Sequence, residues 1–339
     1  MIQIQQLKLQ IPHTEEQLLR KAAKLLKIRE QEIHDLQIVR RSLDARKKPV
    51  LFYVYTVCLK TSKENMLKKK LRDKNISFLP KEIPYDIKAA GTENLRHRPV
   101  VIGTGPAGLF CGYQLARLGY RPILLERGAD VETRQKDVER FWETGELNTN
   151  SNVQFGEGGA GTFSDGKLNT LVRDDSGRNR AVLQTFVEFG APEHILYDAK
   201  PHVGTDILAK VVKNMRKAIE EAGGEVRFHC LATDFHVFDE EDGVPRLLSL
   251  TVQNVLTGET EEFPADLAVL AVGHSARDTF YRLQERGLRM QAKSFAVGVR
   301  VEHSQHFINE SQYGAGWEGK LPAAPYKLTA KLPDGRGEN

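Results

Sequence analysis

The sequence lacks a long apolar run and contains few cysteines. Its longest nearly apolar stretch, residues 50–59, has about half of the roughly 20 residues that a membrane-spanning helix needs. The three cysteines, Cys58, Cys111 and Cys230, show no CxxC spacing. No basic segment followed by an apolar run stands near Met1, so we expect no secretory signal. These absences argue against a disulfide framework, a cysteine-based metal site and a membrane span, and predict a cytoplasmic protein.

Charge divides the 339 residues into two unequal parts. Residues 1–90 contain 20 lysines and arginines against 10 aspartates and glutamates, whereas the rest of the chain contains 29 against 35. Opposite balances of this kind are typical of separate units, and we expect a boundary near residue 91. Pro80, Pro84 and the polar stretch at residues 91–94 are typical of a linker at this place.

The basic N-terminal part, residues 1–90, predicts a small module of strands and helices. Alternating apolar residues at 7–11 and the aromatic and β-branched run at 50–59 predict strands, with a further strand at 33–41. Thr14 to Gln17 has the pattern of a capping box that opens a helix, and a second such pattern precedes the basic helix at 66–72. The order βαββα favours a ferredoxin-like module.

Beyond Arg98, strand and helix patterns alternate, which predicts an α/β domain with a doubly wound parallel sheet. Residues 99–102 and 123–125 are short apolar strands, and the amphipathic stretch at 205–222 predicts a helix that ends at Gly223 and Gly224. The continuous apolar run at 267–272 predicts a strand buried on both faces.

A dinucleotide-binding fingerprint lies between the first strand and helix of this domain. Residues 100–108 read VVIGTGPAG, so that Gly103, Gly105 and Gly108 follow a strand in GxGxxG spacing. The first glycine allows a tight turn, the second lets the backbone approach a pyrophosphate, and the third lets the helix pack on the strand. Glu126 ends the next strand, where a carboxylate can accept the hydroxyl protons of an adenosine ribose and disfavours a 2′-phosphate. The fingerprint alone fits NAD or FAD.

Two features downstream favour FAD over NAD. A glycine-rich loop without proline covers residues 156–167 and can lie against an extended planar ligand. The apolar segment 266–273 ends in glycine and is similar to the second FAD motif of flavoproteins related to glutathione reductase.

These motifs together resemble the FAD-dependent dehydrogenase family, also called NAD(FAD)-utilising dehydrogenases, within the glutathione-reductase-like flavoproteins. The resemblance lies in residues 40–48, 100–112, 155–168, 201–206 and 295–303. It implies an FAD-binding domain at 96–170 and 200–280, and a substrate domain at 171–199 and 281–339 that is incomplete at its C-terminus. The basic module at 1–90 precedes both.

From the motifs and the resemblance we predict cofactor contacts along the whole domain. Arg127 and Arg134 follow the ribose carboxylate, Lys167 stands at the end of the glycine-rich loop, and His274 follows the second FAD motif. The full predicted cofactor set is Gly103, Gly105, Pro106, Ala107, Gly108, Glu126, Arg127, Arg134, Gly159, Ala160, Gly161, Thr162, Lys167, Gly273 and His274. No catalytic base and no metal ligand is predicted.

The predicted activity is hydride transfer between flavin and an unidentified small-molecule substrate or NAD(P)H, with FAD bound non-covalently. Two alternatives remain open at this stage. Arg40, Arg41 and residues 46–48 lie beside a strand with Tyr53 and Tyr55, and basic charge with interleaved aromatics also suits an RNA-modifying flavoenzyme. The other alternative is a non-catalytic FAD-binding protein.

Overall fold

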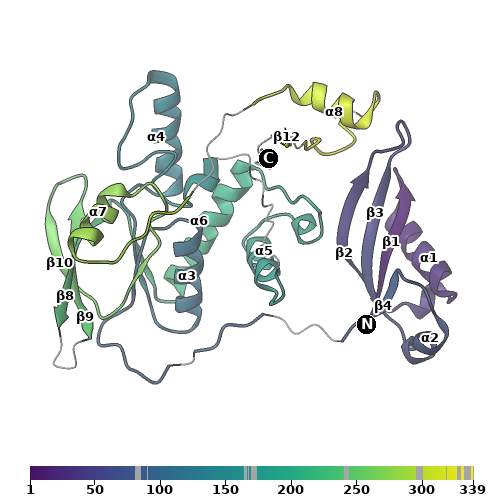
Figure 1. Cartoon of the computed structure of the whole chain (residues 1–339), viewed down its shortest axis with the longest axis horizontal. Helices are drawn as coiled ribbons and strands as arrows, with labels where there is room; N and C mark the ends of the chain where they lie inside the picture. The colour runs from purple at the N-terminus through teal and green to yellow at the C-terminus, as the bar shows by residue number, and fades with distance from the viewer. Residues whose placement is uncertain are drawn as a thin grey trace. The chain divides into compact units, whose positions relative to one another are not determined.

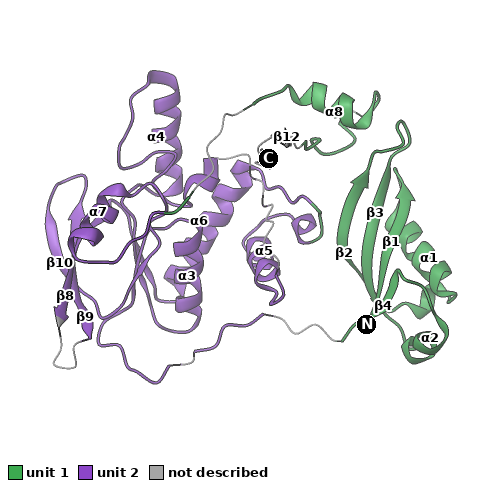
Figure 2. Cartoon of the chain, viewed as in Figure 1, with its two compact units in different colours: residues 1–83, 197–199, 293–339 green, residues 84–196, 200–292 purple. Residues whose placement is uncertain are grey.

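The computed structural model describes residues 1–80, 85–89, 91–163, 166, 168, 174–239, 244–294, 301–317, 319–326, 330–331 and 337–338. The chain forms two compact units (Figures 1 and 2). Unit 1 comprises residues 1–83, 197–199 and 293–339, and unit 2 comprises residues 84–196 and 200–292. Within the described residues, no helix combines the length and the apolar character that crossing a bilayer would need.

Unit 1 is built on a four-stranded antiparallel sheet in the order β2-β3-β1-β4. Its strands are β1 (Ile2–Gln10), β2 (Asp35–Asp44), β3 (Phe52–Lys60) and β4 (Ile76–Phe78). Its helices are α1 (Glu15–Leu26), the single turn η1 (Glu30–Glu32), α2 (Glu64–Lys70) and, much later in the chain, α8 (Gln305–Tyr313). Two short strands, β12 (Ala330–Lys331) and β13 (Gly337–Glu338), also belong to this unit. β4 is an element that the sequence pattern did not predict.

Local signals in the sequence place the first helix of unit 1. Thr14 accepts a hydrogen bond from the amide of Gln17, and the Gln17 side chain accepts one from the amide of Thr14, which is the expected capping box. The apolar stripe of α1, with Leu18, Ala22 and Leu26 buried, packs against the apolar face of the sheet. This packing buries the residues whose period-2 and period-3.6 patterns predicted the elements.

Unit 2 is built on a four-stranded parallel sheet in the order β11-β5-β6-β7. Its strands are β5 (Val100–Ile102), β6 (Ile123–Leu125), β7 (Glu225–Arg227) and β11 (Ala268–Leu270). The helical elements are α3 (Pro106–Arg117), α4 (Val131–Thr144), η2 (Ala160–Phe163), α5 (Arg178–Glu188), η3 (Glu193–Leu196), α6 (Thr205–Glu221) and α7 (Arg277–Glu285). A second, antiparallel sheet contains β8 (Cys230–Asp239), β9 (Pro245–Asn254) and β10 (Thr260–Pro264) in the order β10-β9-β8.

The two faces of the parallel sheet carry different layers, so the expected doubly wound arrangement is wrong. Val101 and Leu124 point to the face covered by α3 and α6, which lie side by side in Figure 1. Val100, Ile102, Ile123 and Leu125 point to the other face and pack against the antiparallel sheet. The long strands β8 and β9 bury Phe235, Leu250 and Val252 there, and so replace the second helical layer.

One other expectation about unit 2 differs from the structure. β11 lies at the edge of the sheet, and Leu267 and Leu270 are 41% and 42% exposed, so the run at 267–272 is not buried on both faces. Residues 178–196 pack into the same core as α3 and α6, and α7 packs on β8. Compact unit 2 therefore continues through both stretches, and the division into an FAD-binding and a substrate domain stays a prediction.

Candidate functional site

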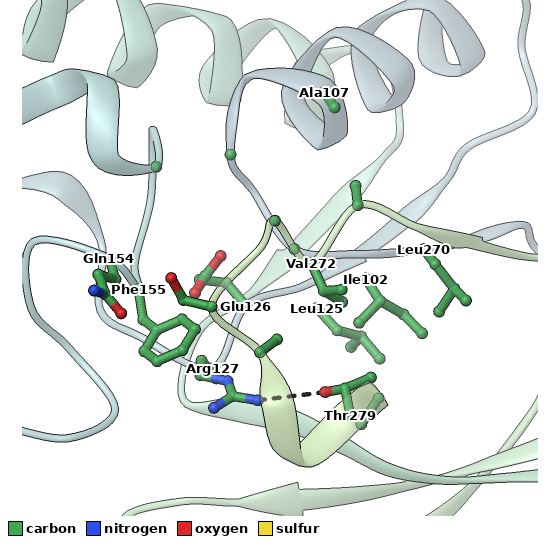
Figure 3. A pocket seen from close by; sticks show the side chains of 18 of the residues that line it. Ile102, Ala107, Leu125, Glu126, Arg127, Gln154, Phe155, Leu270, Val272 and Thr279 are labelled. Atoms are coloured by element: carbon green, nitrogen blue, oxygen red, sulfur yellow. Dashed lines mark hydrogen bonds between the residues drawn. The ribbon is translucent and has the colours of Figure 1, made fainter. Parts of the chain in front are cut away.

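A cavity of about 460 Å³ opens where β5 and β6 end (Figure 3). That volume is in the range of small-molecule sites. The carboxyl ends of parallel strands are where α/β sheets bind ligands, because the following loops leave a crevice there. The lining comes from five regions of unit 2: the β5–α3 turn, the end of β6, the glycine-rich loop with the two residues before it, the start of β8, and the stretch from β11 into α7.

The fingerprint glycines lie where the sequence pattern predicts, and the structure gives each a separate physical reason. Gly103 has φ +99°, and a Cβ there would lie 2.5 Å from the carbonyl oxygen of Ala271. A Cβ on Gly108 would lie 1.8 Å from the Gly103 oxygen. Gly105 differs, because its φ of −65° suits any residue and the nearest atom to a Cβ would be the Gly159 Cα at 3.9 Å. Gly105 therefore keeps space open on the cavity side.

Helix α3 begins at this open space. Gly105 is its N-cap and Pro106 its first residue, a position where proline loses no helical hydrogen bond. The amides of the first helical turn have no carbonyl partner within the helix, and the helix dipole makes this end electropositive. Gly105, Pro106 and Ala107 line the cavity, and the arrangement suits a bound anion such as a pyrophosphate.

Glu126 is buried at the end of β6, and its carboxylate accepts hydrogen bonds from three segments of the chain. One carboxylate oxygen accepts hydrogen bonds from the amide and the hydroxyl of Thr104, both at 2.8 Å. The other accepts from the amides of Gly128 at 2.9 Å and Gly156 at 3.0 Å. A carboxylate has about four acceptor positions, so protein donors already occupy them. The predicted contact with a ribose would have to share or displace one of these donors, and it stays a prediction.

Arg127 closes one side of the cavity. Its guanidinium lies 4.4 Å from the centre of the Phe155 ring, donates to Asp278 at 2.8 Å and approaches Thr279 at 3.4 Å. Figure 3 shows Arg127, Phe155 and Glu126 on one side of the cavity, while Ile102, Leu125, Leu270 and Val272 form its apolar side. The site thus offers a polar region and an apolar region to one ligand.

A buried acid also fixes the glycine-rich loop. Glu157 is fully buried, accepts from the amide of Val131 at 2.8 Å and pairs with Arg216 of α6 at 2.8 Å. Burial raises the pKa of Glu157, while Arg216 opposes the shift. The pair connects the loop to α4 and α6.

The remaining predicted cofactor residues divide into three groups. Gly159, Ala160, Gly273 and His274 line the cavity together with Gly103, Gly105, Pro106, Ala107, Glu126 and Arg127. Gly108, Arg134, Gly161 and Thr162 do not line it. Thr162 is buried, and its hydroxyl oxygen has no hydrogen-bond partner in the described part of the chain. Lys167 lies outside the described residues.

The sequence argument missed several residues of the lining. Gln154, Phe155 and Gly156 border the polar side, and residues 230–232, Phe280 and Leu283 border the apolar side. Phe155 and Gly156 begin the motif at 155–168 that carried the resemblance, so that signal was present. Residues 230–232 belong to the antiparallel sheet, whose position against β5 and β6 no local pattern reveals.

Comparisons with known proteins agree with a nucleotide-binding site in this place. Residues 101–145 match the family described as NAD(P)-binding Rossmann-like domain, and residues 294–338 match FAD-dependent protein, C-terminal domain-like. Residues 1–59 match a domain of unknown function, DUF8436. The chain therefore combines a Rossmann-like FAD/NAD(P)-binding domain with a C-terminal segment of a kind found in FAD-dependent proteins.

One curated relative covers most of the chain. An uncharacterized protein of Clostridium beijerinckii is 45% identical over 311 residues, which are 91% of this chain but 56% of the relative. The chain thus spans little more than half of that protein's length.

Solved structures with similarity to the chain include several flavoproteins. THI4 of Thermovibrio ammonificans has 19% identity and a TM-score of 0.37, over 57% of this chain and 63% of its own. The flavin-dependent monooxygenase PieE, solved with FAD and substrate, has 16% identity and a TM-score of 0.35, over 57% and 33%. A flavocytochrome c3 fumarate reductase has 16% identity and a TM-score of 0.31, over 51% and 33%.

Proposed function

We propose that the protein is an FAD-dependent oxidoreductase that exchanges a hydride between bound flavin and NAD(P)H or a small organic substrate, as in the dehydrogenase family that its motifs resemble. The observation that carries the proposal is the open space at Gly105, which lies between the first turn of α3 and the glycine-rich loop and borders a cavity. A protein that needed only a tight turn there would not require the second glycine, since its φ of −65° suits other residues.

The residues present fit a dinucleotide. The first turn of α3 would bind the diphosphate, and the absence of a side chain at Gly105 lets the backbone approach it. Glu126 would face the ribose, and Arg127 with Phe155 would border the adenosine end. The match of residues 294–338 to a domain of FAD-dependent proteins favours FAD over NAD as the resident cofactor.

When bound, FAD supplies two-electron redox chemistry at its isoalloxazine ring. The role of the protein is to bind and orient the cofactor and to keep water away from it. The apolar side of the cavity, with Ile102, Leu125 and Val272, excludes water from part of the site. The proposal includes no acid or base among these residues.

Anaerobic addition of NADH or NADPH to the flavin-containing protein tests the proposed reaction. We expect the oxidised flavin absorbance to fall with one of the two nucleotides and to return when an electron acceptor is added. Photoreduction with a deazaflavin, which needs no substrate site, is the control that the bound flavin is redox-active. A flavin that is reduced by light but by neither nucleotide removes NAD(P)H as the donor, and one that no screened organic substrate reduces either supports a non-catalytic FAD-binding protein.

A further inference from the structure

Arg134 lies on α4 and is the largest fully buried side chain of the described residues, with no exposed surface. Its guanidinium is surrounded by main-chain carbonyl oxygens of one short stretch that leads into the glycine-rich loop. Nε donates to Asn152 at 2.8 Å, Nη2 donates to Val153 at 2.9 Å, and Nη1 donates to Gly156, Glu157 and Gly159 at 3.2, 2.6 and 2.9 Å. The carbonyls of residues 152–159 therefore converge on one buried cation.

This convergence sets the direction of the peptide groups. In a trans peptide the carbonyl and the following amide point to opposite sides. The carbonyls of Gly156, Glu157 and Gly159 face Arg134, so the amide that follows each of them faces the other way. The amides of Glu157 and Gly158 donate to the carbonyls of Ala129 and Thr104, at 3.1 and 2.9 Å, so the Ala160 amide is the one that can serve the cavity. Gly159 and Ala160 line the cavity, and a Cβ on Gly159 would lie 3.2 Å from the Gly105 Cα, so this peptide adjoins the first turn of α3. The Gly159–Ala160 peptide has its negative end on Arg134 and thus leaves its positive end for an anion.

The glycine-rich loop needs a glycine where it passes the Arg134 side chain. Gly156 has φ +118°, and a Cβ there would lie 2.4 Å from Cδ of Arg134. Its amide donates to Glu126 at 3.0 Å, so the same residue faces the arginine with its carbonyl and the buried carboxylate with its amide. Arg134 and Glu126 thus hold the two peptide groups that flank Gly156, a residue that lines the cavity.

We propose that Arg134 is a positioning residue that turns the Ala160 amide of the glycine-rich loop toward the cavity and so strengthens the binding of a diphosphate. This revises the predicted direct contact of Arg134 with cofactor, because its donors face the loop and it does not line the cavity. The inference rests on the proposed dinucleotide site. It adds that the affinity for the diphosphate depends on a side chain that does not touch it.

Binding of ADP and of adenosine to the flavin-free protein, measured by calorimetry, tests this role. The two probes differ only in the diphosphate. The dissociation constant of adenosine divided by that of ADP therefore reports the anion site and does not depend on the amount of folded protein. The wild-type protein should bind ADP more tightly than adenosine. Arg134→Met, of similar length and without donors, should lower this ratio by about tenfold for each amide–phosphate hydrogen bond that is lost.

A matched control and a conservative variant complete the test. Arg98 donates to the carbonyls of Arg121, Pro122 and Gly223 elsewhere in unit 2, and Arg98→Met should lower the melting temperature without changing the ratio. Arg134→Lys should give an intermediate ratio, because an ammonium has three N–H groups for five carbonyls. If Arg134→Met does not fold, Arg134→Lys decides by the same ratio.

The outcomes separate the inference from the proposed function. If the wild-type protein binds ADP no more tightly than adenosine, the diphosphate site is wrong and the inference fails with it. If the wild-type protein prefers ADP and the folded Arg134 variants prefer it equally, Arg134 has only a structural role and the proposed function stands.

Discussion

Replacing Gly105 with alanine should separate cofactor binding from folding. The added methyl group would meet no atom closer than 3.9 Å, and the backbone at φ −65° suits alanine. Reduced freedom of the unfolded chain stabilises such a variant by about 0.4–1 kcal/mol. Alanine is a poorer N-cap than glycine, at a cost of similar size. The free energy of unfolding of the flavin-free protein should therefore change by less than about 1 kcal/mol.

The affinity of the Gly105→Ala variant for FAD should fall although its stability changes little. The methyl group would occupy the space in which a diphosphate approaches the first turn of α3, and an overlap of that kind typically costs about 1–3 kcal/mol. The dissociation constant for FAD should therefore rise by about tenfold to a hundredfold. Thermal unfolding of the flavin-free protein and titration of FAD by quenching of its fluorescence measure the two quantities separately.

Gly108→Ala is the matched control, because its Cβ would lie 1.8 Å from the Gly103 oxygen and must disturb the turn itself. It should lower both the melting temperature and the affinity. An unchanged FAD affinity in Gly105→Ala would refute the placement of the diphosphate beside α3, whereas a large loss of stability in that variant would refute the description of Gly105 as open.

Limited trypsin treatment should cut first within residues 85–98, for example at the exposed Lys88, and a first cut elsewhere would count against two units. Arg286 and Arg282 hold the pKa of Asp234 below its ordinary value of 3.8, so Asp234 stabilises the fold above that pH and loses this effect as the pH falls. Asp234→Asn should thus melt at lower temperature at neutral pH and show a smaller acid-induced decrease in melting temperature than wild type; an equal decrease contradicts this. Lys167→Ala should lower the flavin potential by about 30 mV with FAD still bound, measured by dye equilibration, and an unchanged potential would leave Lys167 without that role.

Local sequence signals predicted the elements that begin and border the site. The strand before Gly103, the helix after Gly105 and the strand that ends at Glu126 all occur within a residue or two of the expected places. These signals work because a tight turn, a helix N-terminus and a buried strand each impose residue types at neighbouring positions. The long amphipathic helix α6 was predictable for the same reason, since its buried stripe repeats over 17 residues.

The layer that covers each face of the parallel sheet was not predictable. β5 and β6 have three residues each and are apolar throughout, so their patterns do not tell a helical layer from an antiparallel sheet. The partners of Arg134 and Glu126 were also hidden. Arg134 bonds to main-chain carbonyls of residues 152–159, and Glu126 accepts from the main-chain amides of Thr104, Gly128 and Gly156. Main-chain groups have no signature in the sequence. Only the fold brings those groups together.

Identification of the bound cofactor tests the central claim most directly. The purified full-length protein should be yellow, and heat or acid should release a small molecule that chromatography and mass spectrometry identify as FAD, in a ratio near one per chain. Protein that contains no flavin, takes up none when FAD is added, and yet melts as a folded molecule would contradict the account.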